Sequence, residues 1–136
     1  MTDGAGRRDA DAARGNLEAL GWAGDDVVRS WVGGVAPSVA DHANRHVFGD
    51  VYSLKQLPVR YRELVIAAMI ASTGALPDGA VQHLEVAIRE GVTPGEVDEV
   101  CALLAAYAGF PRAIAFAREV QRQLGPLGPL QSPGRV

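Results

Sequence analysis

The chain has 136 residues, of which 48% are hydrophobic and 21% are charged, and its formal net charge is −3 at pH 7. This is the composition of one ordinary globular domain. The acidic balance without a basic stripe argues against nucleic acid as a partner. No run approaches the roughly 18 uninterrupted apolar residues of a membrane helix, so we expect no membrane association.

The start of the chain and its cysteine content point to a cytoplasmic protein. Residues 1–8 are polar and lack the apolar stretch of a signal peptide. The single cysteine, Cys101, excludes an internal disulfide framework and a CxxC pair within these residues. Because Cys101 lies in an apolar run, we expect an inert core thiol.

Helix signals begin after a loose N-terminal end. Residues 1–9 are rich in Gly, Arg and Asp, and residues 125–136 are rich in Pro and Gly, so we predict two disordered tails around one helical domain at 10–124. Within that domain, Asp25 and Asp26 suit the positive end of a second helix, and Ser38 can cap a third. We predict helices over 10–20, 25–32 and 38–47, then a connection over 49–56.

The second half of the chain carries stronger helix boundaries. Pro58, Pro77 and Pro111 each suit the first turn of a helix. Thr93 and Glu96 form the sequence pattern of a capping box. Alternating strand patterns are missing, so we predict an all-α bundle of six to seven helices. The four helices of this half are expected over 58–72, 77–90, 94–108 and 111–124.

Two of these helices are apolar on nearly every side. They contain residues 64–71 (LVIAAMIA) and residues 100–106 (VCALLAA). A helix without a polar face is expected to be buried all round, and one small domain has difficulty burying two of them. The sequence therefore predicts a homo-oligomer.

Several short segments occur in an ordered set. They are FGDVYS at 48–53, RYRELV at 60–65, QHLEVA at 82–87, GVT at 91–93 followed by Glu96, and YAGFPRA at 107–113, preceded by RG at 14–15 and LG at 20–21. Over about residues 11–124 this set resembles the carboxymuconolactone decarboxylase family, within the alkylhydroperoxidase-like superfamily. The resemblance implies an α-helical fold, trimers or trimer-based hexamers, and no metal or organic cofactor.

A second branch of that superfamily reduces peroxides through a CxxC pair assisted by a Glu and a His. Glu63 and His83 stand where that Glu and His are expected. The two cysteines are expected near Leu76 and Gly79, and neither position is a cysteine. Without a resolving thiol the two-cysteine chemistry has no source of electrons, so we exclude this branch.

The family's type reaction removes CO₂ from a carboxylated unsaturated lactone. It needs a cation for the carboxylate, a donor for the developing enolate oxygen and an acid for the final proton. The resemblance implies that His83 is the acid/base and that Glu63 orients it, while Arg60 suits the substrate carboxylate because its planar fork holds carboxylates. The alternatives are a half-buried His83 that caps a carbonyl and an ordinary i,i+3 ion pair between Arg60 and Glu63. Arg62 is expected to face elsewhere, at the surface or an interface.

Two further residues are predicted to contact substrate. Tyr107 can donate to a lactone or enolate oxygen, although a buried core tyrosine is the alternative. Leu103 stands where we expect a polar residue in many relatives, which points to a more hydrophobic substrate or another reaction. His42 and His46 have a spacing that can hold a metal, but nothing completes a motif, so we expect no metal site.

Three functions remain open. The first is a cofactor-independent decarboxylase or related proton-transfer lyase acting on a small, unsaturated cyclic keto or lactone acid, as in aromatic catabolism. The second is an acid–base enzyme of secondary metabolism acting on a polyketide-like substrate. The third is a non-catalytic oligomer that binds a small molecule or a protein. A pocket that holds His83 and Arg60 together favours the enzymes, and an apolar cleft with both turned to solvent favours the third.

Overall fold

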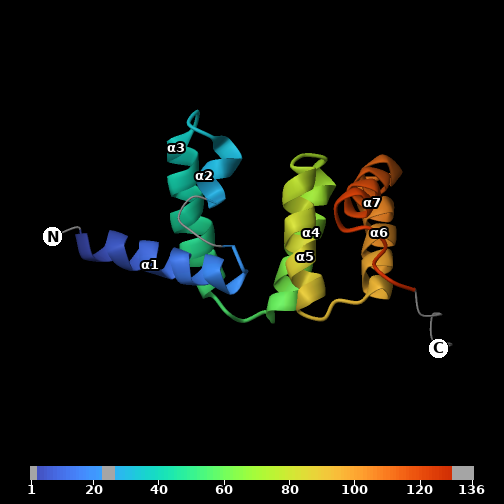
Figure 1. The fold of residues 1–136 in the computed structure, drawn as a ribbon, viewed down its shortest axis with the longest axis horizontal. Coiled ribbons are helices and arrows are strands. Elements are labelled where there is room, and N and C mark those ends of the chain that lie inside the picture. The colour runs from blue at the N-terminus through green and yellow to red at the C-terminus, as the bar shows by residue number, and fades with distance from the viewer. Residues whose placement is uncertain (1–2, 23–26, 130–136) are drawn as a thin grey trace. The chain divides into compact units, whose positions relative to one another are not determined.

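A computed structural model describes residues 3–22 and 27–129, and within them every regular element is a helix (Figure 1). The predicted all-α class is confirmed. None of these helices combines the length and the apolar character that a membrane span requires. The elements are α1 (Asp3–Ala19), α2 (Val27–Val32), α3 (Pro37–His42), the π-helix η1 (Ala43–Asp50), the 3₁₀-helix η2 (Val51–Ser53), α4 (Val59–Thr73), α5 (Pro77–Arg89), α6 (Pro94–Ala108) and α7 (Phe110–Leu124).

The chain divides into two compact units, which meet in the sequence between Gln56 and Leu57. One domain over 10–124 was expected, so the division falls inside it, in the predicted connection. The predicted N-terminal tail is a second difference, because α1 already begins at Asp3. Of the predicted C-terminal tail, residues 125–129 are non-helical and residues 130–136 lie outside the described part, as do Asp25 and Asp26.

In the first unit α1 packs against η1, and the helical path from Pro37 is longer than predicted. Pro37 is the first helical residue and Ala36 precedes it as N-cap, so the predicted cap at Ser38 is wrong. The path continues through η1 and η2 to Ser53, and half of the predicted connection is therefore helical. The side-chain amide of Asn16 secures this turn, because it donates to the Phe48 carbonyl at 2.6 Å and to the Ser53 hydroxyl at 3.2 Å.

The aromatic residues of this unit form one cluster. The rings of Trp22 and Trp31 meet edge to face with centroids 5.8 Å apart, and each lies 6.1 Å from Phe48. Phe48 in turn contacts Tyr52 at 5.0 Å. The two tryptophans therefore serve packing, as edge-to-face aromatic pairs do in cores.

In the second unit the boundaries of α4 to α7 follow the proline, glycine and capping signals. Pro58 precedes the first residue of α4, and Gly74 ends the helix in the left-handed conformation. The capping box is confirmed: the Thr93 hydroxyl accepts from the Glu96 amide at 3.1 Å, and the Glu96 carboxylate accepts from the Thr93 amide at 2.8 Å. The described helix ends thus lie within one or two residues of prediction.

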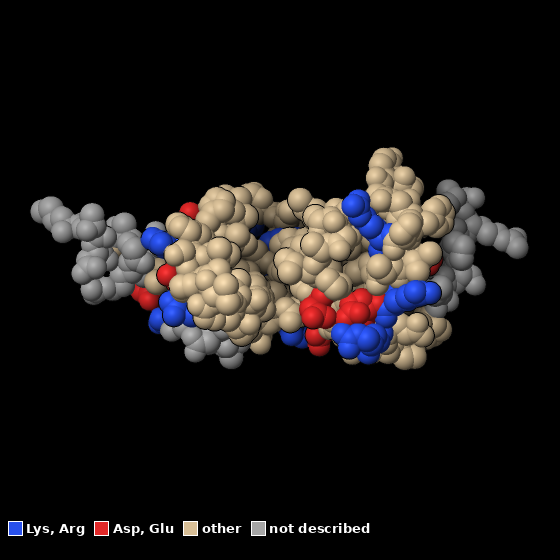
Figure 2. Space-filling model, turned by 90° about the horizontal axis from the view of Figure 1, so that it is seen from above, with Lys and Arg blue, Asp and Glu red and all other residues tan. Residues whose placement is uncertain are grey.

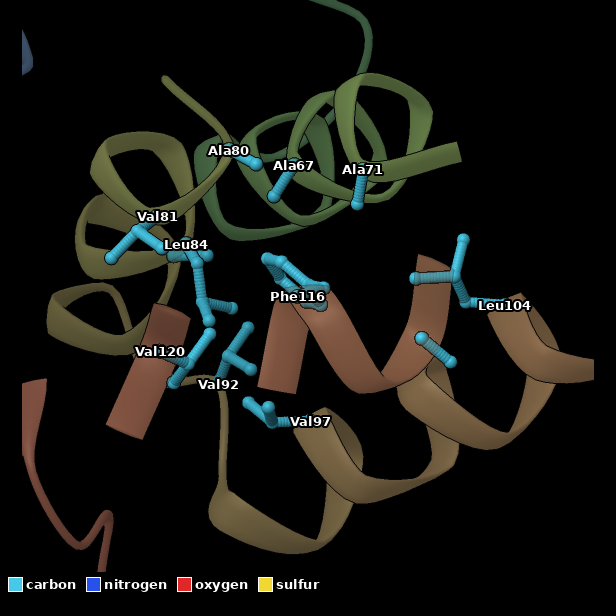
Figure 3. Packing of buried hydrophobic residues seen from close by; sticks show 12 residues of the cluster. Ala67, Ala71, Ala80, Val81, Leu84, Val92, Val97, Leu104, Phe116 and Val120 are labelled. Atoms are coloured by element: carbon cyan, nitrogen blue, oxygen red, sulfur yellow. The ribbon is translucent and has the colours of Figure 1, made fainter. Parts of the chain in front are cut away.

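A shared apolar core joins the four helices of this unit. Figure 3 shows Phe116 of α7 at its centre, facing Ala67 and Ala71 of α4. Small residues on α4 allow the close approach of α5 and α7, which both pack against it. The other labelled members of the core are Ala80, Val81 and Leu84 of α5, Val92, Val97 and Leu104 around α6, and Val120 of α7.

The two apolar helices are not buried on every side within this chain. On α4, 47% of Val65 and 63% of Met69 are exposed, and on α6, 52% of Leu103 is exposed. The face of the molecule seen in Figure 2 likewise carries its charged side chains in patches between broad areas of other residues. The expectation of burial all round therefore fails for the single chain, and one apolar side of each helix is left without cover in the described structure.

Candidate functional site

The N-terminal part of α4 and the middle of α5 bring together two predicted site residues. Glu63 and His83 are 20 positions apart in the sequence, and the Nδ1 atom of His83 lies 2.6 Å from the Oε2 atom of Glu63. Glu63 has 0% of its surface exposed and His83 only 6%. His83 is therefore more deeply buried than the half-buried position considered as an alternative.

Arg62 is the residue that prediction misplaced. Instead of facing away, it reaches Glu63, and its Nε atom donates to the Oε1 atom of Glu63 at 2.9 Å. Its side chain is half-buried, with 15% exposed. Adjacent residues on a helix do not normally face each other, so this contact requires the Arg62 side chain to turn back along the helix surface. The site thus contains an arginine, a carboxylate and an imidazole in a row.

These neighbours keep the Glu63 carboxyl ionised. Burial alone raises the pKa of this group, because a charged carboxylate is poorly solvated in the interior. The hydrogen bonds and charges of His83 and Arg62 outweigh burial and hold the pKa of Glu63 below its ordinary value of 4.5. At neutral pH the site therefore holds a buried carboxylate that accepts from both neighbours.

Arg60 does not join this group. Its guanidinium lies over the ring of Tyr61, 4.7 Å from the centroid, and its Nη2 atom donates to the Tyr61 hydroxyl at 2.9 Å. Arg60 is exposed, as is Tyr61. The arginine that contacts Glu63 is therefore Arg62, one residue before it, and not Arg60 at i−3. The role of Arg60 in binding a substrate carboxylate stays a prediction.

Leu103 and Tyr107 lie in a different place, an apolar groove between α4 and α6 with a volume of about 650 Å³. Tyr107 is 91% exposed, so the alternative of a buried core tyrosine is wrong. Glu63 and His83 are not among the residues that line the groove. The contact of Leu103 and Tyr107 with substrate stays a prediction. The other lining residues are Leu64, Val65, Ala68, Met69, Ser72, Val100, Leu104 and Ala108.

The structure also describes two other candidates from the sequence. His46 is 3.8 Å from Asp50 and both are exposed, and no three His, Cys, Asp or Glu side chains in the described residues are grouped as metal ligands are. Cys101 is half-buried on α6, and burial together with the nearby Asp98 raises the pKa of its thiol. A raised pKa disfavours the reactive thiolate.

The structure thus places a buried carboxylate–imidazole pair on an all-α scaffold. Comparison with known proteins gives the family. The model of the carboxymuconolactone decarboxylase family matches residues 37–122, which include α3 to α6 and most of α7, and the chain belongs to this family. Residues 11–36, where a resemblance was also expected, lie outside that match.

Among curated proteins, the chain is similar to the 4-carboxymuconolactone decarboxylase of Acinetobacter baylyi (strain ATCC 33305 / BD413 / ADP1). The two are 34% identical over 85 residues, which are 60% of this chain and 63% of the relative. The chain therefore spans less than two thirds of the length of this relative.

Proposed function

We propose that this protein is a cofactor-independent carbon–carbon lyase that decarboxylates an unsaturated cyclic lactone or keto acid similar to 4-carboxymuconolactone. The observation that carries the proposal is the buried Glu63–His83 pair, with 2.6 Å between carboxylate and imidazole. Membership of the family and the similarity to a 4-carboxymuconolactone decarboxylase support decarboxylation as the reaction class.

The reaction needs one proton for each CO₂ released. When the C–C bond to the carboxylate breaks, its electron pair moves through the enone onto the lactone carbonyl and forms a dienolate. Protonation of this dienolate on carbon completes the reaction, and the proton is later recovered from water. Positioned acids of this kind contribute about 10²–10⁴-fold to a rate. His83 is our candidate because it keeps a small exposed fraction, whereas Glu63 has none.

Glu63 supports this role by holding the imidazole. A carboxylate that accepts from one ring nitrogen fixes the orientation of the ring and stabilises its protonated form, as in other carboxylate–histidine pairs. In this proposal His83 exchanges the proton and Glu63 stays ionised throughout. The substrate carboxylate binds a separate cation, for which exposed Arg60 remains our candidate.

We further propose that the enzyme works as a homo-oligomer assembled through the groove between α4 and α6. No charged residue lines this groove, and Val65, Met69 and Leu103 are about half exposed in the single chain. A second copy that presents the same apolar surface covers it without leaving a charge unpaired. A trimer or a trimer-based hexamer is the assembly that the family resemblance implies.

The proposed reaction is tested by the release of CO₂ from 4-carboxymuconolactone in a sealed, buffered assay. Wild type is compared with His83→Gln, which keeps a polar side chain but removes the acid. We expect the variant to be about 10²–10⁴-fold slower, with an unchanged far-ultraviolet circular dichroism spectrum.

The control is His46→Gln, the same substitution at a histidine that is 77% exposed and lies in the other unit. It is expected to match wild type. If His83→Gln releases CO₂ as fast as wild type, another group supplies the proton, and the proposed role of His83 is contradicted. A wild type that releases no CO₂ from this substrate contradicts the proposed reaction.

A further inference from the structure

We propose that Arg62 is a positioning residue that determines which nitrogen of His83 carries the proton. The inference deepens the proposed function, because it assigns the protonation of the imidazole that the proposed function uses, and it rests on the proposed function only for its effect on turnover. Arg62 itself contacts the carboxylate of Glu63 and acts on the imidazole through that carboxylate.

The geometry gives each oxygen of the Glu63 carboxylate its own donor. Oε1 accepts from the Nε atom of Arg62 at 2.9 Å, and Oε2 lies 2.6 Å from the Nδ1 atom of His83. A carboxylate held at both oxygens does not rotate, and an ionised carboxylate only accepts hydrogen bonds. The Nδ1 atom must therefore be the donor, and the neutral imidazole carries its proton on Nδ1. The Nε2 atom is then the unprotonated nitrogen of the neutral ring.

The opposite arrangement requires a protonated Glu63. A neutral carboxyl group has a hydroxyl that can donate to Nδ1, and the imidazole proton then moves to Nε2. Burial favours this neutral form, since Glu63 is fully enclosed. The guanidinium of Arg62 favours the ionised form by its charge and its hydrogen bond. Arg62 thus helps to keep the carboxylate ionised, together with the imidazole whose state depends on that carboxylate.

Arg60 shows that this arrangement is particular to Arg62. Both arginines lie in the first turn of α4, but Arg60 is exposed and its guanidinium lies on the ring of Tyr61. Arg62 is largely covered and turns toward an adjacent residue that it would not normally face. Loss of either residue removes one positive charge from the same helix, so Arg60 provides a matched control.

The experiment observes the tautomer directly in the full chain. Two-bond and three-bond ¹H–¹⁵N correlation spectra of the imidazole rings distinguish a proton on Nδ1 from a proton on Nε2. They are recorded on ¹⁵N-labelled protein at a pH where the histidines are neutral. The chain has three histidines, and His83→Gln assigns the signal of His83. We expect the Nδ1–H pattern in wild type and in Arg60→Met, and a shift to a mixture or to the Nε2–H pattern in Arg62→Met.

Two further variants separate charge from hydrogen bonding and provide folded alternatives to Arg62→Met. Arg62→Lys keeps the positive charge and is expected to retain the wild-type pattern at least in part. Arg62→Gln keeps a hydrogen-bond donor without the charge, and this variant is expected to lose the wild-type Nδ1–H pattern. An Nε2–H pattern in wild type overturns the inference, and so does an Nδ1–H pattern that persists in both Arg62→Gln and Arg62→Met.

Turnover separates this inference from the proposed function. With 4-carboxymuconolactone, we expect kcat of Arg62→Met to fall about tenfold or more, while KM changes little, because the residue does not contact substrate. If the tautomer shifts as expected but wild type releases no CO₂, the proposed function fails and the positioning role stands. If CO₂ release by wild type depends on His83 but the tautomer of His83 is the same in the Arg62 variants, the positioning role fails and the proposed function stands.

Discussion

Two regions of α4 each reverse the usual distribution of residues, in which charged side chains lie at the surface and apolar side chains lie in the core. At its N-terminal end the helix buries a charged residue, Glu63, completely. Two and six residues further on, it exposes 47% of Val65 and 63% of Met69. Charged residues are rarely buried without a partner, and apolar residues gathered on a surface mark an interaction site.

The difference between the regions is where their partners lie. The partners of Glu63 belong to the same chain, since His83 and Arg62 contact both of its oxygens. The apolar region faces an open groove, and no described residue covers it. The first region is therefore complete in one chain and suits chemistry. In our proposal, another copy of the chain covers the second region.

The largest effect is expected from a charge placed in the apolar region. Ala68 is half-buried and lines the groove, so Ala68→Glu puts an unpaired carboxylate into the proposed interface. An uncompensated charge of this kind costs about 3 kcal/mol or more, which weakens assembly roughly a hundredfold or more. Size-exclusion chromatography with light scattering measures the change in mass across a dilution series.

The matched control for this prediction is Ala102→Glu. Ala102 is exposed on α6 but does not line the groove, and the variant is expected to assemble like wild type. A wild type that is monomeric at micromolar concentration contradicts the proposed interface. Equal assembly of Ala68→Glu and wild type moves the interface to another surface.

The next effect concerns the charged region and depends on pH. The pKa of Glu63 is lowered in the folded chain, so the unfolded chain binds a proton first as the pH falls. The stability gained from this carboxylate is therefore present above about pH 4.5 and is lost progressively as the pH falls toward the lower folded pKa. In Glu63→Gln this contribution is absent, and urea unfolding at a series of pH values is expected to show a flatter dependence in the acid range.

At neutral pH, Glu63→Gln is expected to lower the free energy of unfolding by about 1–3 kcal/mol, because a neutral amide forms weaker hydrogen bonds with buried His83 and half-buried Arg62. Glu85→Gln makes the same change at an exposed position of α5. It is expected to alter stability by less than about 0.5 kcal/mol. If the free energy of unfolding of Glu63→Gln falls as steeply with decreasing pH as that of wild type, other carboxyl groups account for the loss of stability in acid.

Most of the fold follows from sequence signals that act locally. Proline at a helix start and glycine at a helix end restrict the backbone themselves, so the boundaries of α4 to α7 follow from single residues. The start of α1 and the π-helix η1 do not carry such signals. Their stability depends on packing between α1 and η1 and on the amide of Asn16, and contacts over more than 30 positions leave no local pattern.

The site was predictable in part, for a similar reason. Glu63 and His83 came from a family resemblance, and the fold brings them together because α4 packs against α5. Which of the two arginines, Arg60 or Arg62, contacts Glu63 depends on the rotamers of their side chains. Helical geometry favours an i,i+3 neighbour for Glu63, but the ring of Tyr61 holds Arg60 by a cation–π contact. The adjacent aromatic residue was the sequence signal that pointed to this outcome.

The smallest effect is expected at Arg60, which lies on the same helix as both regions and belongs to neither. Its guanidinium is exposed and already in contact with Tyr61, so any contact with a substrate carboxylate is screened by water. Exposed ion pairs contribute about 0.2–1 kcal/mol, so Arg60→Met is expected to raise KM for 4-carboxymuconolactone up to about fivefold and to leave kcat unchanged. The difference is expected to shrink at high ionic strength, because the Debye length falls to about 3 Å at 1 M salt.

Arg118→Met, at an exposed arginine on α7, controls for the loss of one positive charge and is expected to keep the KM of wild type. If KM is the same in Arg60→Met and Arg118→Met, the substrate carboxylate binds elsewhere, and the first turn of α4 serves only the buried pair.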